Sequence, residues 1–519
     1  MKIQILFLFN FHKNIKTTNY NFGLVTFLKP CYFMKKIFCI FLFFILFAPA
    51  FQSVAAKIIL PAIVSSNMVL QRNTNVKLWG WADANEKITI KTSWLKKSIN
   101  IQADSEGNWS VAVQTTNSKE GQTITLKSKT SNITLNNILF GEVWLCSGQS
   151  NMEMPMKGYA GQPIFGAADA VVKANNPNLR LFSVTRVSGS KTPLKEVLKY
   201  LEWQKATPES VLKFSAVAYF YGQQLQEILD VPVGLILSAW GGSSVQAWMS
   251  TEALSPYQKV DLTNRDINVK PNSIPTALFN SMINPVIPYT IKGAIWYQGE
   301  SNVDQPAKYK ELFPAMVEDW RKRWGIGNFP FYYAQIAPYL YGGNEFTAAN
   351  KNSAFFREVQ LQCLDIIPNS GIAIAMDLGT ESPIHPPKKK EVADRLLYNA
   401  LNQTYSFKNI NYEGPRFESM EVKDAGLLIK FKNEDNGIYS YNGLEGFEIA
   451  GSDKVFYPAN AKIVDRKKVL VSSDKVPSPV AVRYAWNNWV NGTLLNTNLL
   501  PASSFRTDDW TDATKGKKE

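Results

Sequence analysis

The stretch GEVWLCSGQSNMEM, residues 141–154, joins a continuous apolar run to a polar turn. Residues 143–146 form the run, as expected of a strand that is buried on both faces of a parallel sheet. The run stops before Gly148, and the hydroxyl of Ser150 follows at the turn. A serine in this place is either a nucleophile or the N-cap of a helix. The stretch therefore predicts a strand of an α/β sheet with a candidate nucleophile at its carboxyl end.

Further apolar runs of this kind follow along the chain, and amphipathic helical patterns alternate with them. Such alternation predicts the α/β class, with a parallel sheet flanked by helices on both faces. In this arrangement ligands bind beyond the carboxyl ends of the strands. The further predicted strands are residues 233–237, 294–297, 329–336 and 372–376, and the predicted helices are residues 215–229, 307–324, 352–366 and 388–401.

The segments on either side of this region have a different pattern. Residues 57–135 and 410–519 contain short stretches of alternating apolar and polar residues, separated by turn residues. This pattern predicts accessory β-sandwich-like segments at both ends. A chain of 519 residues is too long for one core. We therefore predict an N-terminal β domain, an α/β domain at residues 136–409 and a C-terminal β domain.

Residues 1–56 have the pattern of a leader with a signal peptide. Met34 is followed by two lysines, an apolar run at residues 37–47 and small residues at 53–56. This order is typical of secretory signal peptides. We predict Met34 as the true start, cleavage after Ala55 or Ala56 and a secreted or periplasmic product. The apolar run is shorter than the ~20 residues that cross a membrane, so we predict no stable membrane insertion after leader removal.

The net charge of +13 does not point to a nucleic acid partner. Part of the charge lies in the leader, and no basic run stands beside aromatic residues that could stack on bases. Cys146 and Cys363 lie in apolar stretches after the leader, which predicts two buried free thiols and leaves a single disulfide open. Because the thiols are not clustered and histidine is scarce, we predict neither a metal nor another cofactor.

The scarcity of histidine singles out one residue. The chain has two histidines, and His12 lies in the leader. His385 is therefore the one candidate for an imidazole base after leader removal, in a proline-bounded loop that follows a predicted strand. A serine hydroxyl needs such a base to lose its proton during attack. A lone loop histidine is otherwise an ordinary surface residue, so its role depends on Ser150 at a neighbouring strand end.

Four short blocks follow predicted strands: Gly148-Gln149-Ser150-Asn151-Met152, Trp240-Gly241-Gly242-Ser243, Trp296-Tyr297-Gln298-Gly299-Glu300-Ser301-Asn302 and Ile384-His385-Pro386-Pro387. Their residues and order resemble the signature blocks of the SGNH (GDSL-type) hydrolases, in the sialate O-acetylesterase branch. The resemblance covers residues 57–508 and includes an opening stretch at 67–72 and a closing stretch at 482–486. It implies an SGNH-type sheet for the α/β domain and esterase activity.

The resemblance also implies roles for single residues. Ser150 matches the nucleophile and His385 the general base. The backbone N–H groups of Ser150 and Gly242, or less favourably Gly241, match donors to the oxyanion, where a glycine lets the backbone approach the substrate. Gln298 matches a side-chain amide donor, and each such donor is worth about 3–4 kcal/mol.

Substrate-binding candidates come from the same blocks. Gln298 and Glu300 could instead have a structural role, in a hydrogen-bond network at the strand end. The substrate-binding candidates are Trp240, Gly241, Glu300 and Asn302.

One position departs from the family pattern. Many relatives have an aspartate two or three residues before the histidine, where this chain has Pro383 and Ser382. Asp377 or Glu381 could orient the imidazole instead, or a backbone carbonyl could hold it and leave a Ser–His dyad. We predict Asp377.

The predicted function is that of a secreted carbohydrate esterase that removes O-acetyl groups from sugars through an acetyl-enzyme. By resemblance, the most favoured activity is sialate O-acetylesterase. The alternatives are a deacetylase of acetylxylan or another polysaccharide, and a catalytically inactive glycan-binding protein. A lipid esterase is disfavoured because no second apolar segment follows the leader. The partner is therefore an acetylated carbohydrate, and no oligomeric state is predicted.

Overall fold

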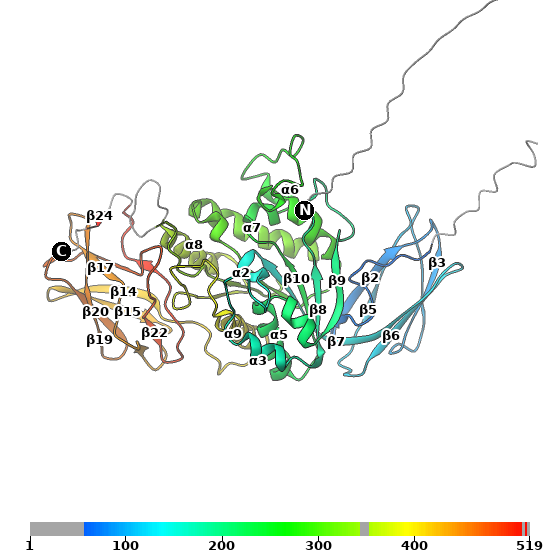
Figure 1. Cartoon of the computed structure of the whole chain (residues 1–519), viewed down its shortest axis with the longest axis horizontal. Coiled ribbons are helices and arrows are strands. Elements are labelled where there is room, and N and C mark those ends of the chain that lie inside the picture. Colours follow the sequence, from blue (N-terminus) through cyan, green and yellow to red (C-terminus); the bar gives the residue numbers. More distant parts are fainter. Residues whose placement is uncertain (1–56, 343–351, 511–513, 516–519) are drawn as a thin grey trace, which may run out of the picture. The chain divides into compact units, whose positions relative to one another are not determined.

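A central sheet of α/β type dominates the computed structural model, which describes residues 57–342, 352–510 and 514–515 (Figure 1). Its strand order is β13-β12-β11-β7-β10-β8-β9. All neighbours pair in parallel except β9, which is antiparallel to β8. The strands are β7 (Asn132–Gly148), β8 (Asn176–Val184), β9 (Tyr200–Ala206), β10 (Val233–Ala239), β11 (Gly293–Tyr297), β12 (Phe331–Ala334) and β13 (Ser370–Ala373).

Helices cover both faces of this sheet, because its strands are apolar on both faces. Along β7, Leu145 packs in a core with Phe313 and Phe356 of α7 and α8, and its neighbour Trp144 packs in a second core with residues of α5 and α9 such as Tyr221. The helices are α2 (Ser150–Glu153), α3 (Ala167–Val172), α4 (Pro208–Lys213), α5 (Ala216–Leu229), α6 (Thr251–Leu254), α7 (Pro306–Trp324), α8 (Ser353–Ile366) and α9 (Lys389–Asn399).

The N-terminal segment is built from short antiparallel strands. β2 pairs with β5, and β6 joins β3 to β7. Because β7 continues without a break into the central sheet, the predicted domain boundary at residue 136 falls inside one strand. The strands are β1 (Val69–Gln71), β2 (Asn75–Trp81), β3 (Lys87–Thr92), β4 (Ile99–Gln102), β5 (Asn108–Gln114) and β6 (Gln122–Lys127).

The C-terminal segment contains a sheet of order β14-β15-β20-β19, another of order β23-β21-β17-β18-β24, and the pair β16-β22. The strands are β14 (Arg416–Lys423), β15 (Gly426–Lys432), β16 (Ile438–Tyr439), β17 (Phe447–Ala450), β18 (Val455–Pro458), β19 (Asn460–Val464), β20 (Lys468–Ser472), β21 (Ala481–Tyr484), β22 (Leu495–Asn496), β23 (Phe505–Arg506) and β24 (Thr514–Lys515).

The predicted fold class is confirmed, with a mixed central sheet rather than a wholly parallel one. The sequence did not predict β8 and β9, because their apolar residues do not form one uninterrupted run. Cys146 and Cys363 are buried free thiols, as predicted. The leader, including Met34 and the cleavage site, lies outside the described residues. Within the described ranges, no helix has the length and apolar character needed to cross a membrane.

Candidate functional site

The turns after β7, β10 and β11 meet at one edge of the central sheet. Gly148 is in register with Ala239 on one side and with Tyr297 on the other. Gly148 has a φ of +140°, and a Cβ there would lie 2.2 Å from the carbonyl oxygen of Tyr297. A glycine is therefore required where β7 turns into α2. This turn places Ser150 at the first position of the helix.

The structure brings Ser150 and His385 into contact. The imidazole lies in the loop between β13 and α9, and its Nε2 is 2.8 Å from Ser150 Oγ. On the other side of the ring, Nδ1 lies 2.7 Å from Oε1 of Gln162. An amide oxygen can only accept, so Nδ1 carries the proton and Nε2 presents its lone pair to the serine hydroxyl. This is the tautomer that a general base needs.

The orienting residue of His385 is Gln162, which corrects the prediction of Asp377. The carboxylate of Asp377 forms a two-pronged pair with Arg395, with N–O distances of 2.7 and 2.6 Å. A guanidinium fork matches a carboxylate in this way, and it takes both oxygens. No local pattern pointed to Gln162, which lies in an irregular loop 223 residues before the histidine.

His385 is neutral near neutral pH. Its burial, and then the charge of Lys389, lower its pKa to about 4. The ring also packs edge-to-face against Tyr159, with centroids 5.3 Å apart. A neutral imidazole in this position can accept a proton from Ser150.

The turn after β10 lies against the serine. A Cβ on Gly241 would lie 3.3 Å from Ser150 Cβ. The N–H of Gly241 donates to Oε2 of Glu153 at 2.7 Å, so it is not available to an oxyanion. In the described part of the chain, the backbone N–H groups of Ser150 and Gly242 donate to no protein acceptor. Asn272 holds this turn by donating to the carbonyl of Gly241 at 2.9 Å.

Gln298 belongs to a structural network, which corrects its predicted role as an oxyanion donor. Its Nε2 donates to the carbonyl of Ser243 at 3.0 Å and to Oδ1 of Asn302 at 2.8 Å, so both amide hydrogens are used. Asn302 also accepts from the N–H of Val245 and donates to Gln246. Both side chains are buried. Asn302 therefore joins strand ends, and the structure does not present it to a substrate.

Behind the serine lies a buried network that links three of the blocks. Asn151 Nδ2 donates to Glu300 Oε1 at 2.5 Å and to the carbonyl of Ile384 at 3.3 Å, and its Oδ1 accepts from Lys389 Nζ. Burial raises the pKa of Glu300 and lowers the pKa of Lys389 to about 7. Asn151 thus ties the turn of the nucleophile to the loop of His385. Glu300 supports this link, so the structure does not support its predicted contact with substrate.

Trp240 remains a candidate for contact with a sugar. Its backbone N–H donates to the carbonyl of Gly148 at 3.0 Å, which fixes the backbone of Trp240 beside the serine turn, and its side chain is half-buried. The role of Trp240 in binding a sugar stays a prediction, and its side chain packs partly against the core.

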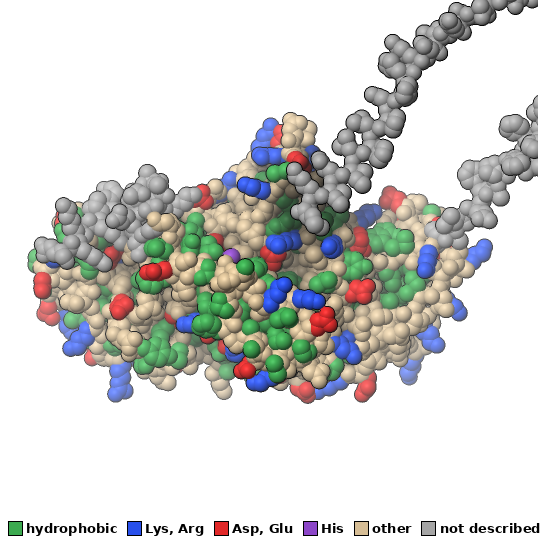
Figure 2. Space-filling model, in the orientation of Figure 1, with side chains coloured by type: hydrophobic (Ala, Val, Ile, Leu, Met, Phe, Trp, Pro, Cys, Tyr) green, Lys and Arg blue, Asp and Glu red, His purple; other side chains and the backbone are tan. Residues whose placement is uncertain are grey.

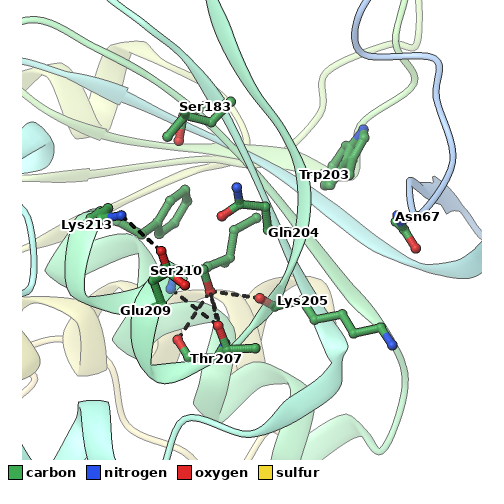
Figure 3. Close-up of a pocket in the computed structure, with 12 residues that line it drawn as sticks. Asn67, Ser183, Trp203, Gln204, Lys205, Thr207, Glu209, Ser210 and Lys213 are labelled. Atoms are coloured by element: carbon green, nitrogen blue, oxygen red, sulfur yellow. Dashed lines mark hydrogen bonds and ion pairs between the residues drawn. The ribbon is translucent and has the colours of Figure 1, made fainter.

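A cavity of 460 Å³ between β8, β9 and α4 contains none of the predicted site residues (Figure 3). Several of its polar side chains bond to other groups of the cavity wall. Ser210 Oγ donates to the carbonyl of Lys205 at 2.7 Å, and Lys213 pairs with Glu209 at 3.2 Å. We therefore place the functional site at the serine and not in this cavity.

Charged side chains do not single out another site on the face that Figure 2 shows. On the face shown in Figure 2, Lys and Arg side chains are interspersed with Asp and Glu side chains. Across the described ranges, no group of three or more His, Cys, Asp or Glu residues could hold a metal ion. That the protein has no cofactor and no nucleic acid partner remains a prediction from the sequence.

Comparisons with known proteins agree on one family. The family model described as carbohydrate esterase, sialic acid-specific acetylesterase matches residues 140–393. The sialate O-acetylesterase of Homo sapiens is 29% identical over 482 residues, covering 82% of this chain and 87% of the human protein. That of Pongo abelii is 30% identical over 485 residues, with coverage of 82% and 87%. A crystal structure of a carbohydrate acetylesterase from Xanthomonas citri superposes with a TM-score of 0.79 at 33% identity, covering 87% of this chain and all of that one.

Proposed function

Because the chain belongs to the sialate O-acetylesterase family of carbohydrate esterases, we propose that it removes O-acetyl groups from sialic acid through Ser150 and His385. The chain is a carboxylic ester hydrolase, and its family places it among enzymes that deacetylate sugars. The observation that carries the proposed mechanism is the distance of 2.8 Å between Ser150 Oγ and His385 Nε2.

In the first half of the proposed reaction, Ser150 Oγ attacks the acetyl carbonyl carbon while its proton passes to His385 Nε2. The C–O bond to the sugar then breaks, and the imidazolium returns the proton to the sugar oxygen as it leaves. The product of this half is an acetyl ester on Ser150 together with the free sugar hydroxyl.

In the second half, a water molecule gives a proton to His385 and attacks the acetyl-serine. The bond between the acetyl carbon and Oγ then breaks, Ser150 Oγ recovers the proton from the imidazolium, and acetic acid leaves and ionises to acetate. Gln162 is a positioning residue in both halves, because its amide oxygen accepts from Nδ1 and keeps Nε2 facing the hydroxyl. A neutral amide does not stabilise the imidazolium as a carboxylate would, so the imidazole keeps its low pKa.

The proposed oxyanion donors are the backbone N–H groups of Ser150 and Gly242. Both lack an acceptor within the described residues. Gly242 has a φ of +67°, where a side chain would be strained, so a glycine suits this turn. Donors that are fixed before the reaction stabilise developing charge without reorganisation.

The proposed substrate is an O-acetylated sialic acid, and we further propose that the leader exports the enzyme to the periplasm or beyond. The substrate assignment is supported by the family and by the relatives named above. Acetylxylan stays the alternative substrate, because the comparisons also include a carbohydrate acetylesterase whose sugar is not specified.

The test is acetate release by the full chain from O-acetylated sialic acid and from acetylxylan, with the variants Ser150→Ala and His385→Ala run beside it. We expect faster release from the sialic acid and loss of release in both variants. Faster release from acetylxylan would mean that acetylxylan, and not O-acetylated sialic acid, is the substrate. Binding of the glycan without any release would instead identify an inactive glycan-binding protein.

A further inference from the structure

A half-exposed arginine stands at the rim of the site. Arg186 follows β8, whose carboxyl end lies at the same edge of the sheet as Gly148 because β8, β10 and β7 are parallel. Its Nη1 lies 3.1 Å from Glu153 Oε1, and its side chain is 55% exposed. Within residues 57–342 and 352–510, its Nε and Nη2 have no hydrogen-bond partner.

Short contacts connect this guanidinium to the nucleophile. Glu153 lies one helical turn after Ser150 in α2, and its other oxygen accepts from the N–H of Gly241 at 2.7 Å. Gly241 in turn lies against Ser150. Arg186 is therefore linked to the serine through one carboxylate and one glycine.

The pair with Glu153 does not account for this arginine. Glu153, whose side chain is 18% exposed, already has a donor in the N–H of Gly241, and Arg186 uses only Nη1 in the pair. The pair holds the guanidinium in place by Nη1, and within the described residues Nε and Nη2 are left without a protein acceptor. A guanidinium edge of this kind binds a carboxylate with two parallel hydrogen bonds. Lys389, which reaches the serine turn through Asn151, is fully buried.

We propose that Arg186 binds the carboxylate of an acidic sugar and so makes the site select acetylated sialic acid over acetylated neutral sugars. The proposal rests on the function proposed above for Ser150. Arg186 is a specificity residue in this account, because it touches the substrate away from the acetyl group that reacts.

The kinetic test compares the full chain with Arg186→Gln on three substrates: O-acetylated sialic acid, its methyl ester, which has no carboxylate, and p-nitrophenyl acetate. We expect KM for the acid to rise roughly 10- to 100-fold, and KM for the methyl ester and turnover of p-nitrophenyl acetate to change less than about twofold. Arg186→Lys keeps the charge but not the fork, so we expect a smaller rise for the acid. Equal losses on all three substrates would mean that Arg186 only supports the Gly241 turn, and would overturn the proposal.

Lys213→Gln is the matched control. Lys213 also pairs with a glutamate and is 59% exposed, but it lies at the cavity of Figure 3 and not at the serine. The control removes the same charge, so a rise in KM for the acid as large as that of Arg186→Gln would trace the effect to net charge and overturn the proposal.

A binding test keeps this proposal separate from the catalytic one. The Ser150→Ala variant is titrated with deacetylated sialic acid and with its methyl ester, alone and combined with Arg186→Gln. We expect the acid to bind more tightly than the ester, and the second substitution to abolish the difference. Equal binding of acid and ester would overturn the role of Arg186 even if Ser150 is the nucleophile. Absence of acetate release together with selective binding of the acid would instead overturn the catalytic proposal alone.

Discussion

Strand β7 carries a polar cluster at each end of its central-sheet segment, and the two clusters differ in how fully their groups are paired. At the amino end, Glu142 is buried and accepts from Gln71, Arg72 and Tyr405 at 3.2, 2.6 and 3.1 Å. At the carboxyl end, Ser150 is half-exposed, and its backbone N–H has no acceptor within the described chain.

This difference separates a structural cluster from a reactive one. A cavity of 660 Å³ lies at the amino end and is lined by Glu142, so cavity size alone would place the function there. The carboxylate at that end already has three donors, as expected of a buried charge that must be satisfied. The carboxyl end instead keeps a hydroxyl, an imidazole and backbone donors ready for a ligand.

The largest effect is expected from Ser150→Ala. Removing the hydroxyl abolishes acyl transfer, so kcat for acetate release should fall roughly 10⁴-fold or more. Because the side chain is half-exposed and, among the described residues, its Oγ bonds to His385 alone, the free energy of unfolding should change by less than about 0.5 kcal/mol. Steady-state rates and urea unfolding check the two parts. A variant with a tenth of the wild-type rate would show that another group is the nucleophile.

The next effect is expected from Gln162→Leu, which removes the acceptor of His385 Nδ1. We expect kcat to fall roughly 10- to 100-fold with little change in KM, since the imidazole loses its orientation and tautomer while the substrate contacts remain. Gln162→Glu serves as the companion variant, because it keeps the acceptor. An unchanged kcat in Gln162→Leu would remove Gln162 from the mechanism.

The third prediction concerns how kcat/KM falls at low pH, which tests the state of the imidazole at the carboxyl end of β7. His385 acts as a base only when neutral, and its pKa is lowered to about 4. We therefore expect kcat/KM to stay level down to that pH and to fall about tenfold per unit below it. In Gln162→Glu the added carboxylate favours the imidazolium, so the limb should move to higher pH. A wild-type limb near the ordinary histidine value of ~6.5 would contradict the burial argument.

The smallest effect on turnover is expected at the other end of β7. Glu142→Leu leaves the donors of Gln71, Arg72 and Tyr405 without their shared acceptor, so the free energy of unfolding should fall by about 1–3 kcal/mol. The kcat of the folded enzyme should stay within about twofold, because the substitution does not touch the serine turn. Unfolding curves and rates on the same preparation check this. A large loss of kcat at unchanged stability would mean that the two ends are coupled.

The sequence predicted what local patterns encode. The apolar run at residues 143–146 predicted the buried strand. The four blocks, together with the scarcity of histidine, predicted Ser150 and His385 as the reactive pair. For Gln298 and Glu300 the sequence left open a choice between contact with substrate and a hydrogen-bond network at the strand end, and the structure shows the network. The choice, like the role of Asn302, depends on which strand ends pack together.

Two further features lie beyond local patterns. Gln162 comes from an irregular loop with no distinctive neighbours, so its contact with the imidazole is purely tertiary. Lys389 is one of three consecutive lysines at 388–390, and only the packing of α9 decides that this one is buried.

A double-mutant cycle of acetate release by Ser150→Ala, His385→Ala and the combined variant tests the central claim most directly. If the hydroxyl and the imidazole work as one unit, each single variant falls to the same residual rate and the combined variant is no slower. Losses that multiply in the combined variant, or a His385→Ala variant close to the wild-type rate, would contradict the account.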